Sequence, residues 1–541
     1  MSSAELASSV KTPCSSGHAP QRSLAIVGGG PRGLYCLESL ARLARERASL
    51  PRLCITIFEP APTLGAGTVY EPTQPHYLRM NFAAKHINAW PPMSSAADEV
   101  SDPARPSLLQ WLATRNGTRT DRNATLPRAV VGDYLHDCYQ RVARSLPANI
   151  ALRIERVRVN SLRRRGMTWE LTTDRQTVHR FDEVLLTVGH QGWRDDPDRI
   201  YPVTTQLSQQ RVPPAATVVV RGFALTWIDA TLSLTEGRGG RFYPRSAGFR
   251  YERSGAEPAR IVPTSRSFRP LLAKPDDGKT LHLQTCHSIW RPARQWIDSL
   301  VKPKSGFDFM YSLWPIVLNA ASQALEHLDA ADDVEGWMHN WVSGPMSAAE
   351  AESQMRTSFA VAQGQLRPGP AWALGESWRQ LYPSLVNRIS HGGLAAESWP
   401  AFRLVARELE RIAFGPPADN LGRILALIDA GIVDLSGTYS DSAEVRRLNA
   451  VIAAPDDSPK HSPIEQLLQQ GVIHRIPGGQ GIDVDRCGRP LDRDGRPIDG
   501  LAILGRPTED CILGNDTLSR TLHQHPERWA TSVARRLLTS R

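Results

Sequence analysis

The chain has 541 residues, of which 41% are hydrophobic and 22% charged, and its formal net charge is +9. These values are ordinary for a globular protein of two to four domains. No apolar run reaches the ~18 residues that a membrane span needs, so no membrane partner is expected. Residues 1–22 are polar and lack the basic-then-apolar order of a secretory signal, and we expect a disordered leader.

The seven cysteines are scattered and form no CxxC pair. This argues against a zinc ribbon, a disulfide framework or a thiol-redox centre, predicts no metal site, and favours a cytoplasmic location. Arginines are spread along the chain and are not gathered in aromatic-rich basic blocks. The positive charge therefore favours small anions over nucleic acid as partners, and it leaves a homo-oligomer open.

The first nucleotide-binding motif begins at about Ser23, where a short apolar strand, a glycine turn and a helix follow one another. Gly28, Gly30 and Gly33 have the spacing G-x-G-x-x-G. The first glycine permits the tight turn, the second lets the backbone approach a pyrophosphate, and the third allows close packing of helix on strand. Pro31 suits the first helical turn. A second strand ends in Glu59, where an acid is needed for the ribose hydroxyls, so the motif predicts a bound FAD.

A later strand, FDEVLLTVGHQ, runs into Thr187, Gly189 and His190. It is similar to the strand that closes the FAD domain in two-dinucleotide flavoproteins, so Gly189 is a candidate FAD contact. His190 is a candidate acid or base, although a lone histidine at a strand end is more often structural.

Five further stretches are informative together: GAGTVY (65–70), HYLRMNFAAKHINAWP (76–91), PSLLQWL (106–112), LPRAVVGDYLHDCYQRV (126–142) and LAILGRPTEDCILGNDTLSRTL (501–522). In order and character they resemble the flavin-dependent N-hydroxylating monooxygenases, which act on lysine, ornithine and related amines. Among these, the chain is most similar to the aspartate N-monooxygenases that form nitrosuccinate.

The resemblance implies roles for individual residues. It places beside the flavin a group from three of these stretches: Met80, Asn81, Arg128, Gly505, Asp516, Thr517 and Leu518. Lys85 is the nearest counterpart of the lysine that grips the substrate carboxylate in the family, and Arg79 is a second candidate for that role. The reaction that the resemblance implies consumes NAD(P)H and O2.

A second strand-turn-helix pattern, ATVVVRGFALTWIDATLSL, follows at residues 216–234. Gly222 remains, but Ala224 and Trp227 stand where the second and third glycines are expected. Either NAD(P)H binds differently here, or the motif has only a packing role. Arg266, in the arginine-rich stretch that follows, is a candidate for binding the 2′-phosphate of NADPH, because guanidinium groups pair bidentately with phosphate.

The sequence thus predicts an α/β, two-dinucleotide-binding flavoprotein with a Rossmann-type FAD domain, a degenerate NAD(P)-binding domain and a helical insertion. The expected boundaries are a leader over 1–22, the FAD domain over 23–195, the NAD(P)H domain over 214–289, helices over 290–470, and a return to the FAD domain over 471–541.

The predicted function is an FAD- and NAD(P)H-dependent monooxygenase that N-hydroxylates an amino acid, with aspartate as a candidate. No catalytic side chain is assigned, because in flavin enzymes the cofactor carries out the redox chemistry and the side chains mainly bind and orient the reactants. Two alternatives are a flavin oxidase or dehydrogenase that does not use NAD(P)H, and a non-catalytic FAD-binding protein.

Overall fold

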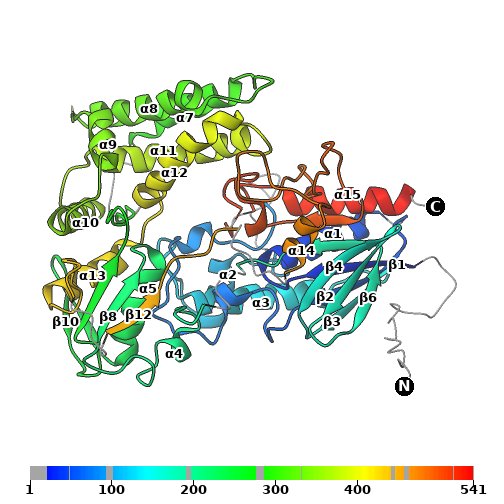
Figure 1. Cartoon of the computed structure of the whole chain (residues 1–541), viewed down its shortest axis with the longest axis horizontal. Helices are drawn as coiled ribbons and strands as arrows, with labels where there is room; N and C mark the ends of the chain where they lie inside the picture. Colours follow the sequence, from blue (N-terminus) through cyan, green and yellow to red (C-terminus); the bar gives the residue numbers. More distant parts are fainter. Residues whose placement is uncertain are drawn as a thin grey trace, which may run out of the picture.

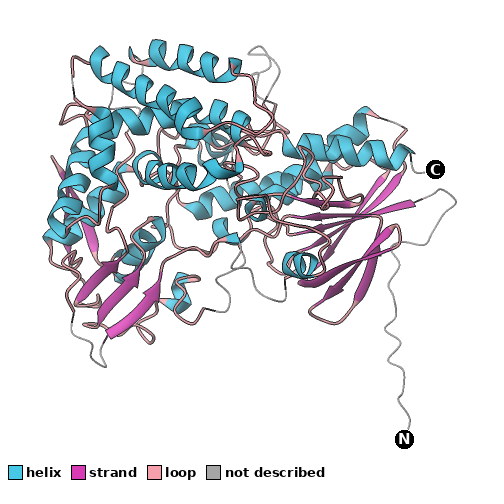
Figure 2. Ribbon diagram, turned by 45° about the horizontal axis from the view of Figure 1, so that its top comes forward, coloured by secondary structure: helices cyan, strands magenta, loops and turns pink. Residues whose placement is uncertain are grey.

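The computed structural model describes residues 21–47, 49–92, 102–190, 196–275, 285–330, 332–439, 445–455, 462–515, 517–518 and 520–539. Two strand-rich regions lie at opposite ends of the long axis, and a layer of helices lies above one of them (Figures 1 and 2). Within the described residues, no helix is both long and apolar enough to cross a membrane.

The first region contains a five-stranded parallel sheet with the strand order β13-β7-β1-β2-β3. The strands are β1 (Gln21–Val27), β2 (Arg52–Phe58), β3 (Ile150–Glu155), β7 (Glu183–Leu186) and β13 (Leu501–Ile503). From Leu24 in β1 and from Leu53 in β2 every residue is buried, as expected for parallel strands that are covered on both faces.

The two faces of this sheet pack against different partners. Leu24 and Ile26 of β1 join a core with residues of α1 (Pro31–Glu46), α3 (Arg128–Arg144) and α15 (His525–Thr539). Ala25 and Val27 join a second core with the antiparallel sheet of β4 (Val159–Arg165), β5 (Thr168–Thr173) and β6 (Val178–Phe181). Helix α2 (Leu108–Asn116) adds Leu108 and Trp111 to the first core.

The second region is a three-stranded parallel sheet with the order β11-β8-β12. Its strands are β8 (Thr217–Arg221), β11 (Arg260–Thr264) and β12 (Val445–Asn449). Their core is shared with α4 (Val203–Gln206), α5 (Leu225–Leu234) and α13 (Ala418–Asp429), and the hairpin of β9 (Arg241–Arg245) and β10 (Gly248–Glu252) lies against α13. Two parallel Rossmann-like sheets confirm the predicted α/β class.

Strand β12 differs from the sequence expectation, because it lies inside the range 290–470 that was expected to be helical. Its five residues VRRLN carry too little periodicity to be distinguished locally. Pairing with β8, more than two hundred residues earlier in the chain, makes them a strand.

The helical layer contains α7 (His287–Ser299), α8 (Trp314–His327), α9 (Val334–Val342), α11 (Pro370–Ile389) and α12 (Trp399–Ala413). Helix α10 (Ala348–Ala362) packs against α13, and its Ala351, Met355 and Phe359 join the core of the second region. Trp290, Trp378 and Trp399 are buried in the core of the helical layer. After α14 (Pro463–Gln469) the chain returns to the first sheet, where β13 pairs with β7.

Candidate active site

A cavity of about 3160 Å³ is lined by both parallel sheets and by the helical layer. Pockets for one small ligand usually measure ~300–1,000 Å³, so this cavity has room for more than one ligand. Among the described residues, fourteen lysine and arginine side chains line it, against nine aspartate and glutamate side chains. This balance favours anionic ligands such as dinucleotide phosphates and carboxylates.

The glycine turn between β1 and α1, which is the predicted pyrophosphate site, lies on the cavity wall. Gly28 has a φ of +107°, and a Cβ there would overlap the carbonyl oxygen of Thr187. A Cβ at Gly33 would overlap the Gly28 carbonyl oxygen. Gly30 is different, because its Cβ would meet the Gly67 Cα at 3.5 Å, which is an ordinary contact. Pro31 occupies the first turn of α1. Because Gly30 and Pro31 both line the cavity, the N-terminus of this helix faces it.

Glu59 follows β2 and lines the same part of the cavity. Its Oε2 accepts a hydrogen bond from the Gly29 N–H at 2.8 Å, and its Oε1 accepts one from the Ala61 N–H at 3.0 Å. These bonds hold the carboxylate in one orientation, and each oxygen has a further lone pair with which to accept from a ribose hydroxyl.

The stretch that was expected to cap the flavin is attached to α1. The Arg32 guanidinium donates to the carbonyl oxygens of Asn515 and Thr517 at 2.8 and 2.9 Å, and the Tyr35 hydroxyl donates to the Leu518 carbonyl at 3.0 Å. Gly505, Thr517 and Leu518 line the cavity, whereas Asp516 lies outside the described residues. Sequence reasoning missed Arg32, because its partners are more than 480 residues away and leave no local signal.

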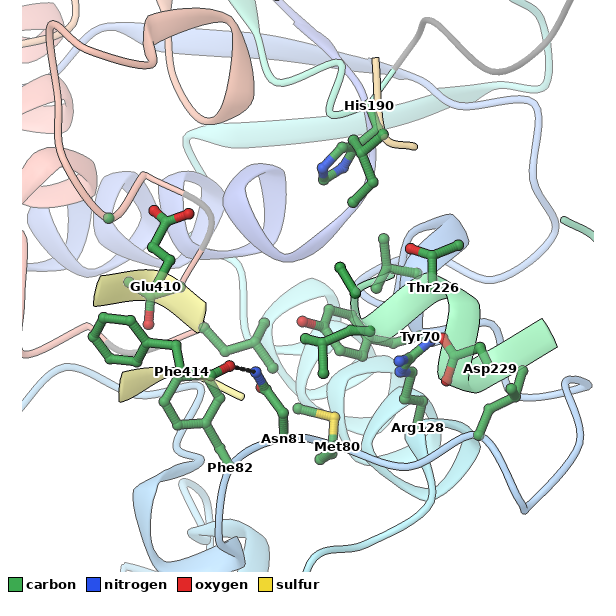
Figure 3. A pocket seen from close by; sticks show the side chains of 18 of the residues that line it. Tyr70, Met80, Asn81, Phe82, Arg128, His190, Thr226, Asp229, Glu410 and Phe414 are labelled. Atoms are coloured by element: carbon green, nitrogen blue, oxygen red, sulfur yellow. Dashed lines mark hydrogen bonds and ion pairs between the residues drawn. The ribbon is translucent and has the colours of Figure 1, made fainter. Parts of the chain in front are cut away.

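The segment around Met80 and Asn81 forms another wall of the cavity (Figure 3). Met80 is buried, and its N–H donates to the Leu126 carbonyl at 2.8 Å. Asn81 Nδ2 donates to the Phe414 carbonyl at 3.5 Å, and Lys274 Nζ donates to the Asn81 carbonyl at 2.5 Å. These two bonds tie the predicted flavin-facing segment to the end of α12 and to the chain that follows β11.

Arg128, the first residue of α3, lines the cavity and joins this helix of the first region to α5 of the second (Figure 3). Its Nη1 lies 2.7 Å from Asp229 Oδ2 on α5 and 3.2 Å from the Tyr201 hydroxyl. Burial disfavours the charged form of Arg128, but Asp229 and Tyr201 outweigh burial and hold its pKa above the usual value. Burial and Asp229 raise the pKa of Tyr201, so its phenol stays protonated. The sequence suggested that Arg128 lies near the flavin but did not indicate this ion pair.

The second strand-turn-helix retains its shape despite the lost glycines. Gly222 has a φ of +117° after β8, and Ala224 caps α5. Trp227 is 2% exposed and packs edge-on against Phe223 at 4.9 Å, so its side chain is accommodated in the core and not in the turn. Gly222, Ala224, Arg266 and Gly189 line the cavity. The N-terminus of α5 therefore remains accessible to a nucleotide phosphate.

The two predicted substrate cations are placed differently. Lys85 lines the cavity, and its Nζ donates to Asn123 Oδ1 at 2.9 Å. Arg79 is not among the lining residues, and its Nη1 donates to the Thr125 carbonyl at 3.0 Å. Burial, reinforced by Arg423, lowers the pKa of Arg79. The cavity also contains side chains from α11 and α12 that sequence reasoning did not consider, among them Glu376, Arg379, Arg407, Glu408 and Arg411.

Two parallel sheets, each with a glycine turn and a helix N-terminus at one cavity, define a dinucleotide-binding α/β protein. Residues 25–191 match the model of a family described as FAD-NAD(P)-binding.

Over nearly its full length, the chain is similar to curated monooxygenases. It is 26% identical to an L-aspartate N-monooxygenase (nitrosuccinate-forming) of Streptomyces cremeus, with 94% of this chain and 90% of that protein covered. It is also 26% identical to a nitrosuccinic acid synthase of Aspergillus oryzae, with 92% and 89% covered. A solved structure of cyclohexanone monooxygenase from Rhodococcus sp. Phi1 aligns with 96% of this chain and 85% of its own, at 14% identity and a TM-score of 0.41. The chain is a flavin monooxygenase-like oxidoreductase, as predicted.

Proposed function

We propose that the chain is an FAD-dependent monooxygenase that uses NAD(P)H and O2 to N-oxidise the amine of an amino acid, with L-aspartate as the candidate substrate. The observation that carries the proposal is the near-full-length similarity to proteins named for this reaction. It is supported by a single cavity onto which both dinucleotide turns open.

The residues of the first turn fit an FAD. Gly28, Gly30 and Pro31 leave the N-terminus of α1 open to the pyrophosphate, and Glu59 is oriented to accept from the ribose. Met80, Asn81 and the 517–518 segment would surround the flavin ring. When bound and reduced, FAD supplies the electrons with which O2 is activated.

The turn after β8 fits the reductant. Gly222 would admit the NAD(P)H pyrophosphate, and Arg266, which is exposed and lines the cavity after β11, would pair with a 2′-phosphate. The Arg128–Asp229 pair would keep the two nucleotide sites in a constant relative position.

The remaining task of the protein is to hold the amine in a water-poor cavity. In an amino-acid substrate the carboxylate is the natural handle, and Lys85 is the predicted cation for it, with Arg79 beside the cavity.

The degenerate second turn favours one alternative, a flavin oxidase or dehydrogenase reduced by its own substrate. Anaerobic mixing of the yellow protein separates the possibilities. Bleaching by NAD(P)H supports the monooxygenase, bleaching by substrate alone supports the oxidase, and bleaching by neither supports a non-catalytic flavin-binding protein.

The substrate is tested in air. If the proposal holds, aspartate stimulates NAD(P)H oxidation by the purified protein, and mass spectrometry detects an N-oxidised product. If aspartate does neither, the aspartate assignment is wrong, and the anaerobic result still decides whether the protein uses NAD(P)H.

A further inference from the structure

One face of α12 presents charged side chains to the cavity. Leu404, Arg407, Glu408 and Arg411 recur at spacings of three or four along this helix and all line the cavity. Because this spacing places side chains on one helical face, Arg407 and Arg411 project into the same part of the cavity.

The arginines here outnumber the carboxylates beside them, because Arg269, Arg407 and Arg411 lie against two acidic side chains, Glu408 and Glu410, and all five line the cavity. Glu408, only 3% exposed, accepts from the Arg269 Nε at 2.9 Å and from the Trp341 indole at 3.0 Å, and it lies 3.8 Å from the Arg411 Nε. Two guanidinium groups therefore share one buried carboxylate. The pKa of Arg411 is lowered by burial and further by Arg269 and Arg407, although Glu408 and the exposed Glu410 oppose the shift.

Arg407 and Arg411, which form a cationic wall of the cavity, lie near the predicted flavin-facing segment around Asn81. The Phe414 carbonyl, one turn after Arg411, accepts from Asn81 Nδ2. The Leu272 N–H donates to the Arg411 carbonyl at 3.0 Å, which brings the chain that carries Lys274 alongside the end of α12. The Lys274 ammonium lies 4.3 Å from the centre of the Phe82 ring and 5.8 Å from that of Phe414.

Cations near the C-terminus of a helix also stabilise the helix dipole, but that role does not require them to line a cavity. A partly buried group of cations that exceeds its carboxylates is stabilised by an anion from outside the protein. The same wall repels the side-chain ammonium of a lysine or ornithine substrate.

We propose that Arg407 and Arg411, backed by the Arg269–Glu408 pair and flanked by Lys274, bind the second carboxylate of a dicarboxylic amino acid. The inference rests on the proposed function and extends it by naming the residues that select an acidic substrate. Guanidinium groups suit this role because they bind carboxylates bidentately.

The test uses FAD-loaded protein and calorimetric titration with succinate, which has two carboxylates but no amine, and with aspartate. Arg407→Gln and Arg411→Gln should each weaken both ligands about ten- to a hundredfold, the usual loss of a charge-assisted hydrogen bond. The matched control is Arg403→Gln on the same helix. Arg403 lies 3.3 Å from Asp510 and is not among the cavity-lining residues. The Arg403→Gln variant should therefore bind succinate and aspartate as tightly as the parent does.

Retained flavin shows that each variant is folded. If Arg411→Gln loses FAD, the succinate affinity of Arg407→Gln alone decides whether the inference holds. Unchanged affinities in the variants, or a parent that binds neither succinate nor aspartate, would overturn the inference. A loss of NADPH affinity without a loss of succinate affinity would also overturn it, because it would assign the arginines to nucleotide phosphate. Succinate has no nitrogen to oxidise, so this result is independent of whether the proposed N-oxidation occurs.

Discussion

Replacing Gly30 with valine would separate nucleotide binding from folding. Gly30 has φ −78° and ψ −165°, a conformation that any L-residue adopts, and its Cβ would lie 3.5 Å from the Gly67 Cα. The substitution should therefore cost the apoprotein no more than ~1 kcal/mol, as for a cap residue that makes no side-chain bond. The two added methyl groups would extend over the turn, into the proposed path of the pyrophosphate.

The expected loss of FAD affinity follows from the hydrogen bonds that would be blocked. A backbone N–H bond to a charged phosphate contributes ~1.5–3 kcal/mol. Losing two such bonds would weaken FAD binding by about a hundredfold or more. The assay measures flavin absorbance per protein after gel filtration, together with the unfolding transition of the apoprotein.

Gly33→Ala is the contrasting variant. Its Cβ would overlap the Gly28 carbonyl oxygen, so the strand and helix must separate. We expect ~1–3 kcal/mol of destabilisation, typical of overpacking, and flavin loss that follows unfolding. If Gly30→Val retains FAD as well as the parent does, the placement of the pyrophosphate at this turn is wrong.

Three further outcomes are expected. Arg266→Ala should weaken NADPH about ten- to a hundredfold more than NADH in stopped-flow flavin reduction, and equal losses would remove Arg266 from the 2′-phosphate role. Lys85→Met should raise the KM for the amino acid and release peroxide in place of oxygenated product, while flavin content stays constant; an unchanged KM would show that Lys85 does not hold the substrate. Burial, reinforced by Arg32, lowers the pKa of His523 to about 4. As the pH falls below ~6.5, the His523 imidazole is protonated in the unfolded chain before it is protonated in the folded protein. The free energy of unfolding should therefore fall by on the order of 3 kcal/mol between pH ~6.5 and pH ~4. In denaturant titrations, the free energy of unfolding of the His523→Gln variant should depend less on pH over this range. A pH dependence equal to that of the parent would show that the pKa of His523 is not lowered.

Local patterns were sufficient for the parts of the fold that are contiguous in sequence. The strand, turn and helix at Gly28–Gly33 could be predicted because the steric needs at Gly28 and Gly33 and the apolar period of the helix are properties of a short segment. The second turn could be recognised from Gly222 alone, but its tolerance of Trp227 could not. A tryptophan at that position is acceptable only because Phe223 and the core of the second sheet receive its ring.

Contacts between residues that lie far apart in the chain could not be predicted from the sequence. The chain order shows neither that Arg128 pairs with Asp229 nor that Arg32 donates to the Asn515 and Thr517 carbonyls, because such contacts depend on how separate elements pack. Strand β12 is a strand only by pairing with β8.

The amino-acid sequence was thus enough to specify the α/β class, the first dinucleotide turn and the monooxygenase resemblance, since each depends on short-range geometry or on motifs kept in order. Which cations face the cavity was decided by tertiary packing. Folding placed Arg79 outside the lining and brought Arg407 and Arg411 into it, because burial and the relative position of α12 and the 80–81 segment are properties of the assembled cores.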